Sequence, residues 1–300
     1  MVDQVGTVDI ERVRAFNRVV TQRVGALHDR YLSRDRSLGE ARVLWEVGEG
    51  GCDVRQLRDR LDLDSGYLSR LLRALEASGL VEVRPGEADR RVRTVSLTPR
   101  GVEERRILDR SSDALAESML APLSAERRHR LVAAMAEVER LLTATLVELR
   151  VTDPEREQAQ HCLAQYFAEL ARRFPSGFDP AISRRAAPEE MRPPRGLFLV
   201  ATLHGEPVGC GGLKFHPGEP TEIKRMWVAE SVRGLGVGRR LLTRLEELAA
   251  EAGVRAVRLD SNGALREAIG MYRSSGYTEV EAFNDEPYAD HWFAKRLDAG

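Results

Sequence analysis

The chain has 300 residues, a formal net charge of −1 at pH 7 and 42% hydrophobic residues. This length allows two domains, and the lack of an apolar run long enough to cross a bilayer excludes a membrane-spanning protein. The near-zero charge excludes nucleic-acid binding through an overall basic field, and the widely spaced Cys52, Cys162 and Cys210 match no metal or redox motif, so we expect a cytoplasmic protein without a bound metal.

Residues 1–145 are expected to form a mostly helical domain with long helices near both ends. Apolar residues at helical spacing mark these two helices. The first stripe is Ile10, Val13, Phe16, Val20, Val24, Leu27 and Tyr31, and the second is Leu131, Met135, Val138 and Leu141. Stripes of this kind need a partner surface, so they favour association between two chains.

Between these helices, residues 54–80 have the pattern of a helix-turn-helix. Leu57 and Leu61 mark a first helix, residues 62–64 form a short turn, and a second helix follows. One face of the second helix carries Leu68, Leu71, Leu72 and Leu75, and the other carries Ser65, Gly66, Ser69, Arg70 and Arg73. Small and basic side chains on one helix face suit entry into the major groove of double-stranded DNA.

A hairpin follows directly, with strands expected over residues 80–84 and 91–97. Its turn and flanks carry Arg84, Arg90, Arg91 and Arg93. A helix-turn-helix followed by a basic hairpin is a winged helix, in which wing arginines contact phosphates and one guanidinium enters the minor groove. The alternative interpretation is a charged hairpin that only faces solvent.

Three short segments give this region a family resemblance. They are Leu75-Glu76-Ala77-Ser78-Gly79-Leu80-Val81, Asp89-Arg90-Arg91 and Leu97-Thr98-Pro99-Arg100-Gly101. Together they resemble the MarR family of transcriptional regulators over nearly all of residues 5–145. The resemblance implies a symmetric homodimer, formed through the terminal helices, on a partly palindromic operator. It also implies that Asp89 orients Arg91, and the DNA-binding candidates are Ser65, Ser69, Arg70, Arg73, Asp89, Arg90 and Arg91.

Residues 146–300 are expected to form an α/β domain. The pattern predicts a strand over 146–151, a helix over 155–173, a hairpin with strands over 197–203 and 207–215, and a strand over 222–228. A glycine-rich turn, a helix that ends at Gly253, a strand over 254–260 and a further helix follow.

The turn after residue 228 contains Arg233-Gly234-Leu235-Gly236-Val237-Gly238-Arg239. Its glycines let main-chain N–H groups converge without a Cβ, and the first turn of the next helix offers unsatisfied donors to a diphosphate. A P-loop would end in Gly-Lys-Ser/Thr, and a dinucleotide fingerprint would have the spacing Gly-x-Gly-x-x-Gly. The observed spacing weakens both nucleotide interpretations.

This turn and the last helix resemble the GNAT N-acetyltransferase superfamily over roughly residues 146–297. Arg233-x-x-Gly236-x-Gly238 matches its coenzyme A loop, and Asn262, Ala268, Ile269, Tyr272, Gly276 and Tyr277 match a second segment. The resemblance implies a central mixed sheet in which two parallel strands splay apart. Acetyl-CoA would lie in that cleft as co-substrate, with no metal, and residues 174–194 would build the acceptor side.

The resemblance assigns roles to particular residues. Main-chain diphosphate contacts fall to Arg233, Gly234, Leu235, Gly236, Val237, Gly238 and Arg239, and amide contacts with pantetheine fall to Met226 and Val228. Asn262 would contact the coenzyme arm, and Tyr272 would donate a proton to the departing thiolate. The alternatives are a core tyrosine at 272 and a helix cap at 262.

Glu222 is the candidate that receives a proton from the amine. Alternation along its strand would put it on the same face as Lys224, Met226 and Val228. It could equally form ion pairs with Lys224, Arg225 or a neighbouring strand.

The sequence thus predicts two domains, 1–145 and 146–300, in one bifunctional protein. The first would regulate transcription, and the second would be an acetyl-CoA-dependent N-acetyltransferase acting on a small amine or amino-acid-like acceptor. Tyr288, His291 and Trp292 could line the acceptor pocket or merely pack near the last strand. Two other functions stay open: a non-catalytic sensor of acetyl-CoA or a metabolite, and an enzyme whose first half is only a dimerisation scaffold.

Overall fold

The computed structural model describes residues 6–27, 31–33, 35–86, 92–175, 177–180, 182–183 and 187–297. The chain divides into two compact units, Met1–Ala134 and Met135–Gly300, and each is described here by itself. The division falls inside a helix that continues to residue 145, so residues 135–145 belong with the second unit, and a domain boundary at 145/146 stays a prediction.

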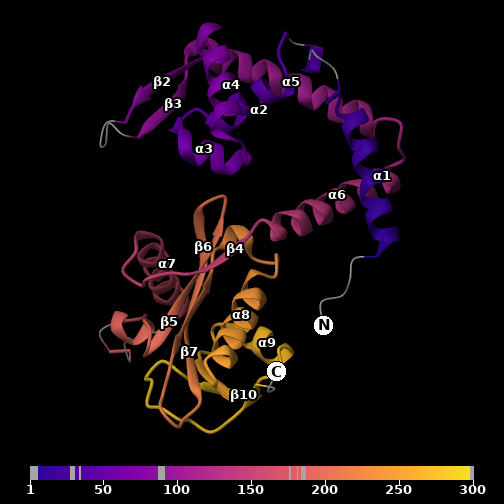
Figure 1. The fold of residues 1–300 in the computed structure, drawn as a ribbon. Coiled ribbons are helices and arrows are strands. Elements are labelled where there is room, and N and C mark those ends of the chain that lie inside the picture. The colour runs from indigo at the N-terminus through magenta and orange to yellow at the C-terminus, as the bar shows by residue number, and fades with distance from the viewer. Residues whose placement is uncertain are drawn as a thin grey trace. The chain divides into compact units, whose positions relative to one another are not determined.

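The first unit is mostly helical (Figure 1). Its helices are α1 (Thr7–Arg23), the short 3-10 helix η1 (Tyr31–Ser33), α2 (Leu38–Val47), α3 (Val54–Leu61), α4 (Ser65–Ala77), α5 (Pro99–Leu120) and the start of α6 (Ala125–Thr145). Three short strands, β1 (Cys52–Asp53), β2 (Val81–Pro85) and β3 (Arg93–Leu97), form an antiparallel sheet in the order β1-β3-β2.

The predicted helix-turn-helix and hairpin are both present. The side chain of Asp53 caps α3, α3 ends where Asp62 adopts a left-handed conformation, and the side chain of Asp64 caps α4. The apolar face of α4 packs into one core with α2, α3 and the base of the β2–β3 hairpin. Because α4 is fixed along its buried face, its other face is held outward.

The second unit is built around a seven-stranded mixed sheet in the order β4-β5-β6-β7-β8-β10-β9. Its strands are β4 (Glu148–Val151), β5 (Gly196–Leu203), β6 (Glu206–Lys214), β7 (Thr221–Val228), β8 (Ala256–Ser261), β9 (Thr278–Glu279) and β10 (His291–Arg296). Its helices are α7 (Glu157–Arg173), α8 (Val237–Glu251) and α9 (Arg266–Ser274), with short 3-10 helices η2 (Pro188–Met191) and η3 (Glu230–Val232). Only β7 and β8 pair in parallel.

Helices cover both faces of this sheet (Figure 1). On one face α8 and α9 bury a core with the middle strands, including the fully buried Leu241, Leu245 and Phe293. On the other face α7 packs through Ala159, Cys162 and Leu163. The fold is the predicted mixed α/β sandwich, and it places β7 and β8 at the centre of the sheet.

A β-bulge interrupts β7 at its middle. The ladder between β6 and β7 shifts register between Cys210 and Gly212, so Arg225 and Met226 together face one residue of β6. Arg225 has a φ of 59°, which is unusual for a residue other than glycine. The thiol of Cys210 donates a hydrogen bond to the main-chain carbonyl of Arg225 at 3.2 Å and so supports the bulge.

The bulge reverses the face to which β7 side chains point. Ile223 packs in the same core as Met226 and Val228, whereas Trp227 packs on the α7 side. Glu222, next to Ile223, therefore points to the α7 side. The prediction that Glu222 shares a face with Met226 and Val228 is wrong, because it assumed unbroken alternation along the strand.

Candidate active site

Strands β7 and β8 separate soon after they begin. They pair only near their starts, through Thr221 and Glu222 of β7, among the residues that the structure describes. The N–H of Ala229 donates to the main-chain carbonyl of Val208 in β6. Because the N–H groups of consecutive strand residues point to opposite edges of the strand, the N–H of Val228 points away from β6 and into the gap. The carbonyl of Val228 accepts a hydrogen bond from Nε of Arg233 at 3.1 Å. One unpaired donor therefore faces the gap at the end of β7.

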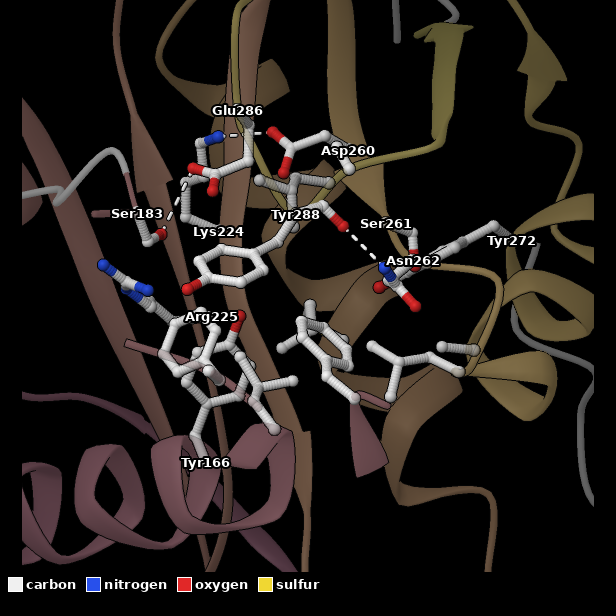
Figure 2. Close-up of a pocket in the computed structure, with 18 residues that line it drawn as sticks. Tyr166, Ser183, Lys224, Arg225, Asp260, Ser261, Asn262, Tyr272, Glu286 and Tyr288 are labelled. Carbon is white, nitrogen blue, oxygen red and sulfur yellow. Dashed lines mark hydrogen bonds and ion pairs between the residues drawn. The ribbon is translucent and has the colours of Figure 1, made fainter. Parts of the chain in front are cut away.

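A cavity of about 90 Å³ lies at this gap (Figure 2). Several separate segments border it. They contribute Tyr166 and Leu170 from α7, Lys224, Arg225 and Met226 from β7, Asp260 and Ser261 from β8, Asn262 after β8, Tyr272 from α9, and Glu286 and Tyr288 before β10. The cavity thus collects ionisable, hydroxyl and aromatic side chains beside the exposed edge of β7.

Lys224 and Asp260 form an ion pair on the cavity wall, with Nζ 2.5 Å from Oδ1. Burial alone would lower the pKa of Lys224, but the carboxylates of Asp260 and Glu222 raise it. Asp260 also accepts a hydrogen bond from the side chain of Asn284 at 3.0 Å. Lys224 therefore stays charged, and it is a fixed cation rather than a base.

Glu222 is buried below the cavity and does not border it. Its carboxylate lies 3.0 Å from Arg258, 3.3 Å from Lys224 and 3.4 Å from His216. Burial alone would raise the pKa of Glu222, but these neighbouring cations lower it below its usual value. A carboxylate held in its charged form is a weak proton acceptor, so the ion-pair interpretation of Glu222 gains support.

Tyr272 borders the cavity from α9 with only 5% of its surface exposed. Its ring packs against Tyr277 and Phe293 at centroid distances of 5.9 and 6.0 Å. Burial raises the pKa of the Tyr272 hydroxyl, so the hydroxyl keeps its proton at neutral pH. The ring of Tyr272 therefore packs in the core, and the residue also borders the cavity.

Asn262 makes two side-chain hydrogen bonds within the protein. Its Nδ2 donates to the main-chain carbonyl of Tyr288 at 2.6 Å, and its Oδ1 accepts from the N–H of Ala264 at 2.9 Å. Helix α9 begins four residues later, with Leu265 at the N-cap. The capping interpretation of Asn262 is therefore wrong, and its bonds instead hold the segment before β10 against the cavity.

The glycine turn opens into α8 as the sequence predicts. Gly234 and Gly236 have φ values of 80° and 76°, and no atom lies within 4 Å of where either would carry a Cβ. A Cβ on Gly238 would instead come within 3.1 Å of the sulfur of Met271. The turn is thus an open concave main chain at a helix N-terminus, which fits an anionic group such as a diphosphate.

The side chain of Glu169 joins the glycine turn to the rest of the domain. Glu169 is buried on α7, and its carboxylate lies 2.6 Å from Arg233, 3.2 Å from Arg173 and 3.0 Å from Nε1 of Trp227. Arg173 also donates to the main-chain carbonyl of Ala264 at 2.8 Å. We call these residues, Glu169, Arg173, Trp227 and Arg233, the Glu169 cluster.

The end of α6 contacts the same turn. Arg140 donates to the main-chain carbonyl of Gly234 at 2.6 Å. Arg240, in the first turn of α8, donates in the opposite direction to the main-chain carbonyls of Ala144 and Val147, at the end of α6 and just after it. All these residues belong to the second unit, and they tie the last turns of α6 to the turn that opens α8.

The sequence named Lys224 and Arg225 only as possible partners of Glu222 and gave no role to Asp260 or Glu169, although signals for such residues exist. Lys224 and Arg225 are consecutive cations within a largely buried strand, a pattern that demands partners. Glu169 falls on the apolar stripe of α7, between Tyr166 and Leu170. A buried charge at such a position indicates a partner across the fold.

The three residues near β10 that could line the acceptor pocket have different positions in the structure. Tyr288 borders the cavity, and its hydroxyl accepts a hydrogen bond from the N–H of Asp179 at 2.9 Å. His291 instead pairs with Glu279, and Nε1 of Trp292 donates to Asn284. Neither of those two borders the cavity, so packing explains them.

In the first unit, the outer face of α4 is open to solvent. Ser65, Arg70 and Arg73 are exposed, and Ser69 is half-buried. The guanidinium of Arg70 lies over the ring of the exposed Tyr67, 5.5 Å from its centroid. The wing candidates Asp89, Arg90 and Arg91 lie outside the described residues, so their roles stay predictions.

The apolar stripes of the terminal helices are also exposed. Ile10, Val13, Phe16 and Val20 on α1, and Val132, Met135, Leu141 and Leu142 on α6, all expose a large share of their surface. Helix α1 is shorter than predicted, since it ends at Arg23 before Gly25, which has a φ of 71°. Tyr31 instead packs in the helix-turn-helix core.

Among the described residues, no group of three or more His, Cys, Asp or Glu side chains is arranged to hold a metal ion. No helix in the described ranges has the length and apolar character needed to cross a membrane.

Comparisons with known proteins identify both parts of the chain. The profile of the acetyltransferase (GNAT) family matches residues 163–277, and that of the MarR family matches residues 35–92. IAA acetyltransferase from Azospirillum brasilense is 32% identical over 139 residues, which are 46% of this chain and 90% of that protein. The HTH-type transcriptional regulator TtmR from Methylorubrum extorquens is 46% identical over 59 residues, which are 20% of this chain and 29% of that protein.

Among solved structures, an acetyltransferase of the GNAT family from Staphylococcus aureus matches with a TM-score of 0.44 and 16% identity, over 51% of this chain and 99% of that one. The chain covers 90% of the length of the Azospirillum relative. It has an N-terminal region similar to the MarR family, and through its C-terminal acyltransferase domain it belongs to the GNAT acetyltransferase family.

Proposed function

We propose that the C-terminal domain transfers an acetyl group from acetyl-CoA to the amine of a small acceptor. The observation that carries this proposal is the parting of β7 and β8 beside the glycine turn. The parted strands leave an edge to which an extended, amide-containing arm can add by main-chain hydrogen bonds. The glycine turn offers converging N–H groups to a diphosphate. Acetyl-CoA carries both an amide arm and a diphosphate.

The reaction requires one proton donor that the cavity supplies. The neutral amine nitrogen forms a bond to the acetyl carbonyl carbon and gives up a proton to water, the carbon–sulfur bond breaks, and the sulfur gains a proton from a donor that water then reprotonates. Tyr272 is assigned as that donor, because it borders the cavity and its burial keeps the hydroxyl protonated. Glu222 is the residue that the sequence suggests as acceptor of the amine proton, and its ion pairs favour at most a small contribution to proton transfer.

The remaining assignments concern binding. The main chain of residues 233–239 would hold the diphosphate, and the amides of Met226 and Val228 would pair with pantetheine. Asn262 would contact the coenzyme arm with its second amide N–H, while its other hydrogen bonds fix the cavity wall. The cavity of about 90 Å³ corresponds to roughly six to nine water-sized volumes, which suits a small acceptor group.

A direct assay tests this proposal. Purified protein with acetyl-CoA and a panel of amines should release coenzyme A thiol with at least one amine, and calorimetry should detect acetyl-CoA binding without any amine. Failure to bind acetyl-CoA would remove the enzymatic proposal. Binding without turnover on every amine would instead favour a sensor.

The sensor alternative has one observation in its favour. Arg140 and Arg240 join the end of α6 to the glycine turn and the start of α8. A ligand on that turn could therefore act on α6, provided that its affinity differs between two conformations of the protein. DNA affinity measured with and without acetyl-CoA distinguishes a coupled protein from two independent functions.

We further propose that the N-terminal region binds a double-stranded DNA operator as a homodimer. The exposed face of α4 supports DNA binding, since a helix with small and basic side chains can enter the major groove. The exposed apolar stripes of α1 and α6 support dimerisation, since contiguous apolar surface of this kind commonly marks an interface.

Arg70→Ala is expected to weaken operator binding about 10- to 100-fold if Arg70 contacts a base edge. The reason is the loss of a charge-assisted contact from the exposed face of α4. Arg244→Ala, which removes a cation from α8 in the other unit, serves as the control. Fluorescence anisotropy on a selected operator measures both, and equal affinities for the two variants would contradict the role of α4.

A further inference from the structure

Arg225 is a buried cation on the wall of the cavity. Only 9% of its surface is exposed, and its guanidinium lies over the rings of Phe167 and Tyr166, 4.8 and 5.6 Å from their centroids. No described carboxylate comes within the 4.0 Å of an ion pair with Arg225. Aromatic faces stabilise a cation only partly, so a buried guanidinium without a carboxylate is one that a ligand can neutralise.

The other charged side chains that border the cavity are already engaged. Lys224 and Asp260 pair with each other. The carboxylate of Glu286 accepts a hydrogen bond from the hydroxyl of Ser183 at 3.2 Å. The bulge at Arg225 explains why this cation differs, because it directs a strand residue toward the cavity that regular alternation would not place there.

The cavity has two chemically different ends (Figure 2). Arg225, Ser183 and the hydroxyl end of Tyr288 lie at one end, whereas Ser261, Asn262 and Tyr272 lie at the other. Tyr272 is the residue assigned to protonate the leaving sulfur, so the reacting amine has to approach that second end. A ligand that spans the cavity would put its amine near Tyr272 and its opposite end near Arg225.

Part of the cavity wall is aromatic. Phe174, Phe178 and Tyr288 pack together with centroid distances of 4.8 to 5.8 Å, and all of them border the cavity. Such rings offer apolar surface and few hydrogen-bonding groups to a ligand. An acceptor that spans the cavity should therefore carry apolar surface.

From these observations we propose that the acceptor is an amino carboxylate with an apolar body, whose carboxylate binds the guanidinium of Arg225. The inference rests on the proposed acetyltransferase function and specifies its substrate class. Arg225 is thereby a specificity residue: it binds the acceptor at the end opposite the reacting amine. A planar guanidinium can hold a carboxylate through two parallel hydrogen bonds, which a neutral carboxamide cannot reproduce.

The test compares three acids whose amine and carboxylate lie at opposite ends of an apolar body with their carboxamides: 4-aminobutyric acid, 6-aminohexanoic acid and 4-(aminomethyl)benzoic acid. For the wild-type protein loaded with coenzyme A, calorimetry should show at least one acid binding about 10- to 100-fold more tightly than its carboxamide. The ratio of kcat/KM values for acid and carboxamide should show the same preference. Arg225→Gln should abolish both preferences, and Arg225→Lys should retain part of them because the charge remains.

Two controls make the outcome specific. Arg258→Gln removes a half-buried cation that also lies over a ring, that of Phe283, but does not border the cavity, so the acid preference should survive. Acetyl-CoA binding should be unchanged in the Arg225 variants, which shows that they are folded. The inference is overturned if no acid is preferred over its carboxamide, or if Arg225→Gln keeps the preference. Loss of acetyl-CoA binding in the wild type would overturn the proposed function instead.

Discussion

Tyr272→Phe should lower kcat for acetyl transfer about 10²- to 10⁴-fold, the range over which general acid catalysis contributes. The substitution removes the hydroxyl that borders the cavity and keeps the ring that packs against Tyr277 and Phe293. Affinity for acetyl-CoA and the melting temperature should therefore change little. Steady-state thiol release and calorimetry on the same preparation measure both quantities.

Tyr277→Phe provides the matched control. It removes a hydroxyl from the neighbouring buried ring, which does not border the cavity, so kcat should be nearly unchanged. Glu222→Gln should lower kcat less than about 10-fold, because Glu222 lies outside the cavity and is a weak base. If Glu222→Gln abolished turnover while Tyr272→Phe kept it, the roles assigned here would be reversed.

Gly236→Val should raise the Kd for acetyl-CoA at least about 10-fold. Gly236 has a φ of 76° at the N-cap of α8, and a side chain there costs about 1–2 kcal/mol in the left-handed region. The added isopropyl group would also project from the concave turn that is proposed to hold the diphosphate. Calorimetry with acetyl-CoA gives the Kd, and chemical denaturation gives the change in the free energy of unfolding.

Gly253→Val separates these two effects. Gly253 has a φ of 83° just beyond the other end of α8, and its Cβ position is equally free of neighbours. It should lose stability like Gly236→Val but keep its affinity for acetyl-CoA. Equal affinity losses in the two variants would mean that backbone strain, and not the turn, controls coenzyme binding.

Local sequence spacing was sufficient to predict much of the fold. Helix caps, apolar stripes and glycine turns depend on residues only a few positions apart, so α3, α4 and α8 form as predicted. The parting of β7 from β8 followed from a family resemblance rather than from the residues themselves. The tip of the wing, with Arg91, remains a prediction.

The bulge in β7 and the charged partners of the site were not predictable by the same means. Alternation assigns every second residue to one face, and only contacts with β6 reveal that Arg225 breaks this rule. The partners of Glu169 lie on α7 and near β7, up to 64 positions away in sequence. Contacts over such separations depend on the topology of the sheet, which periodicity does not encode.

The Glu169 cluster has a consequence for how the cleft receives its ligands. It joins the ends of α7 and β7 and the glycine turn, and through Arg173 it reaches Ala264 and Glu267 at the start of α9, the helix that carries Tyr272. The turn proposed to hold the diphosphate and the helix that carries the proposed proton donor therefore share one electrostatic anchor. If acetyl-CoA binds as proposed, this anchor should reduce the conformational entropy that is lost on binding.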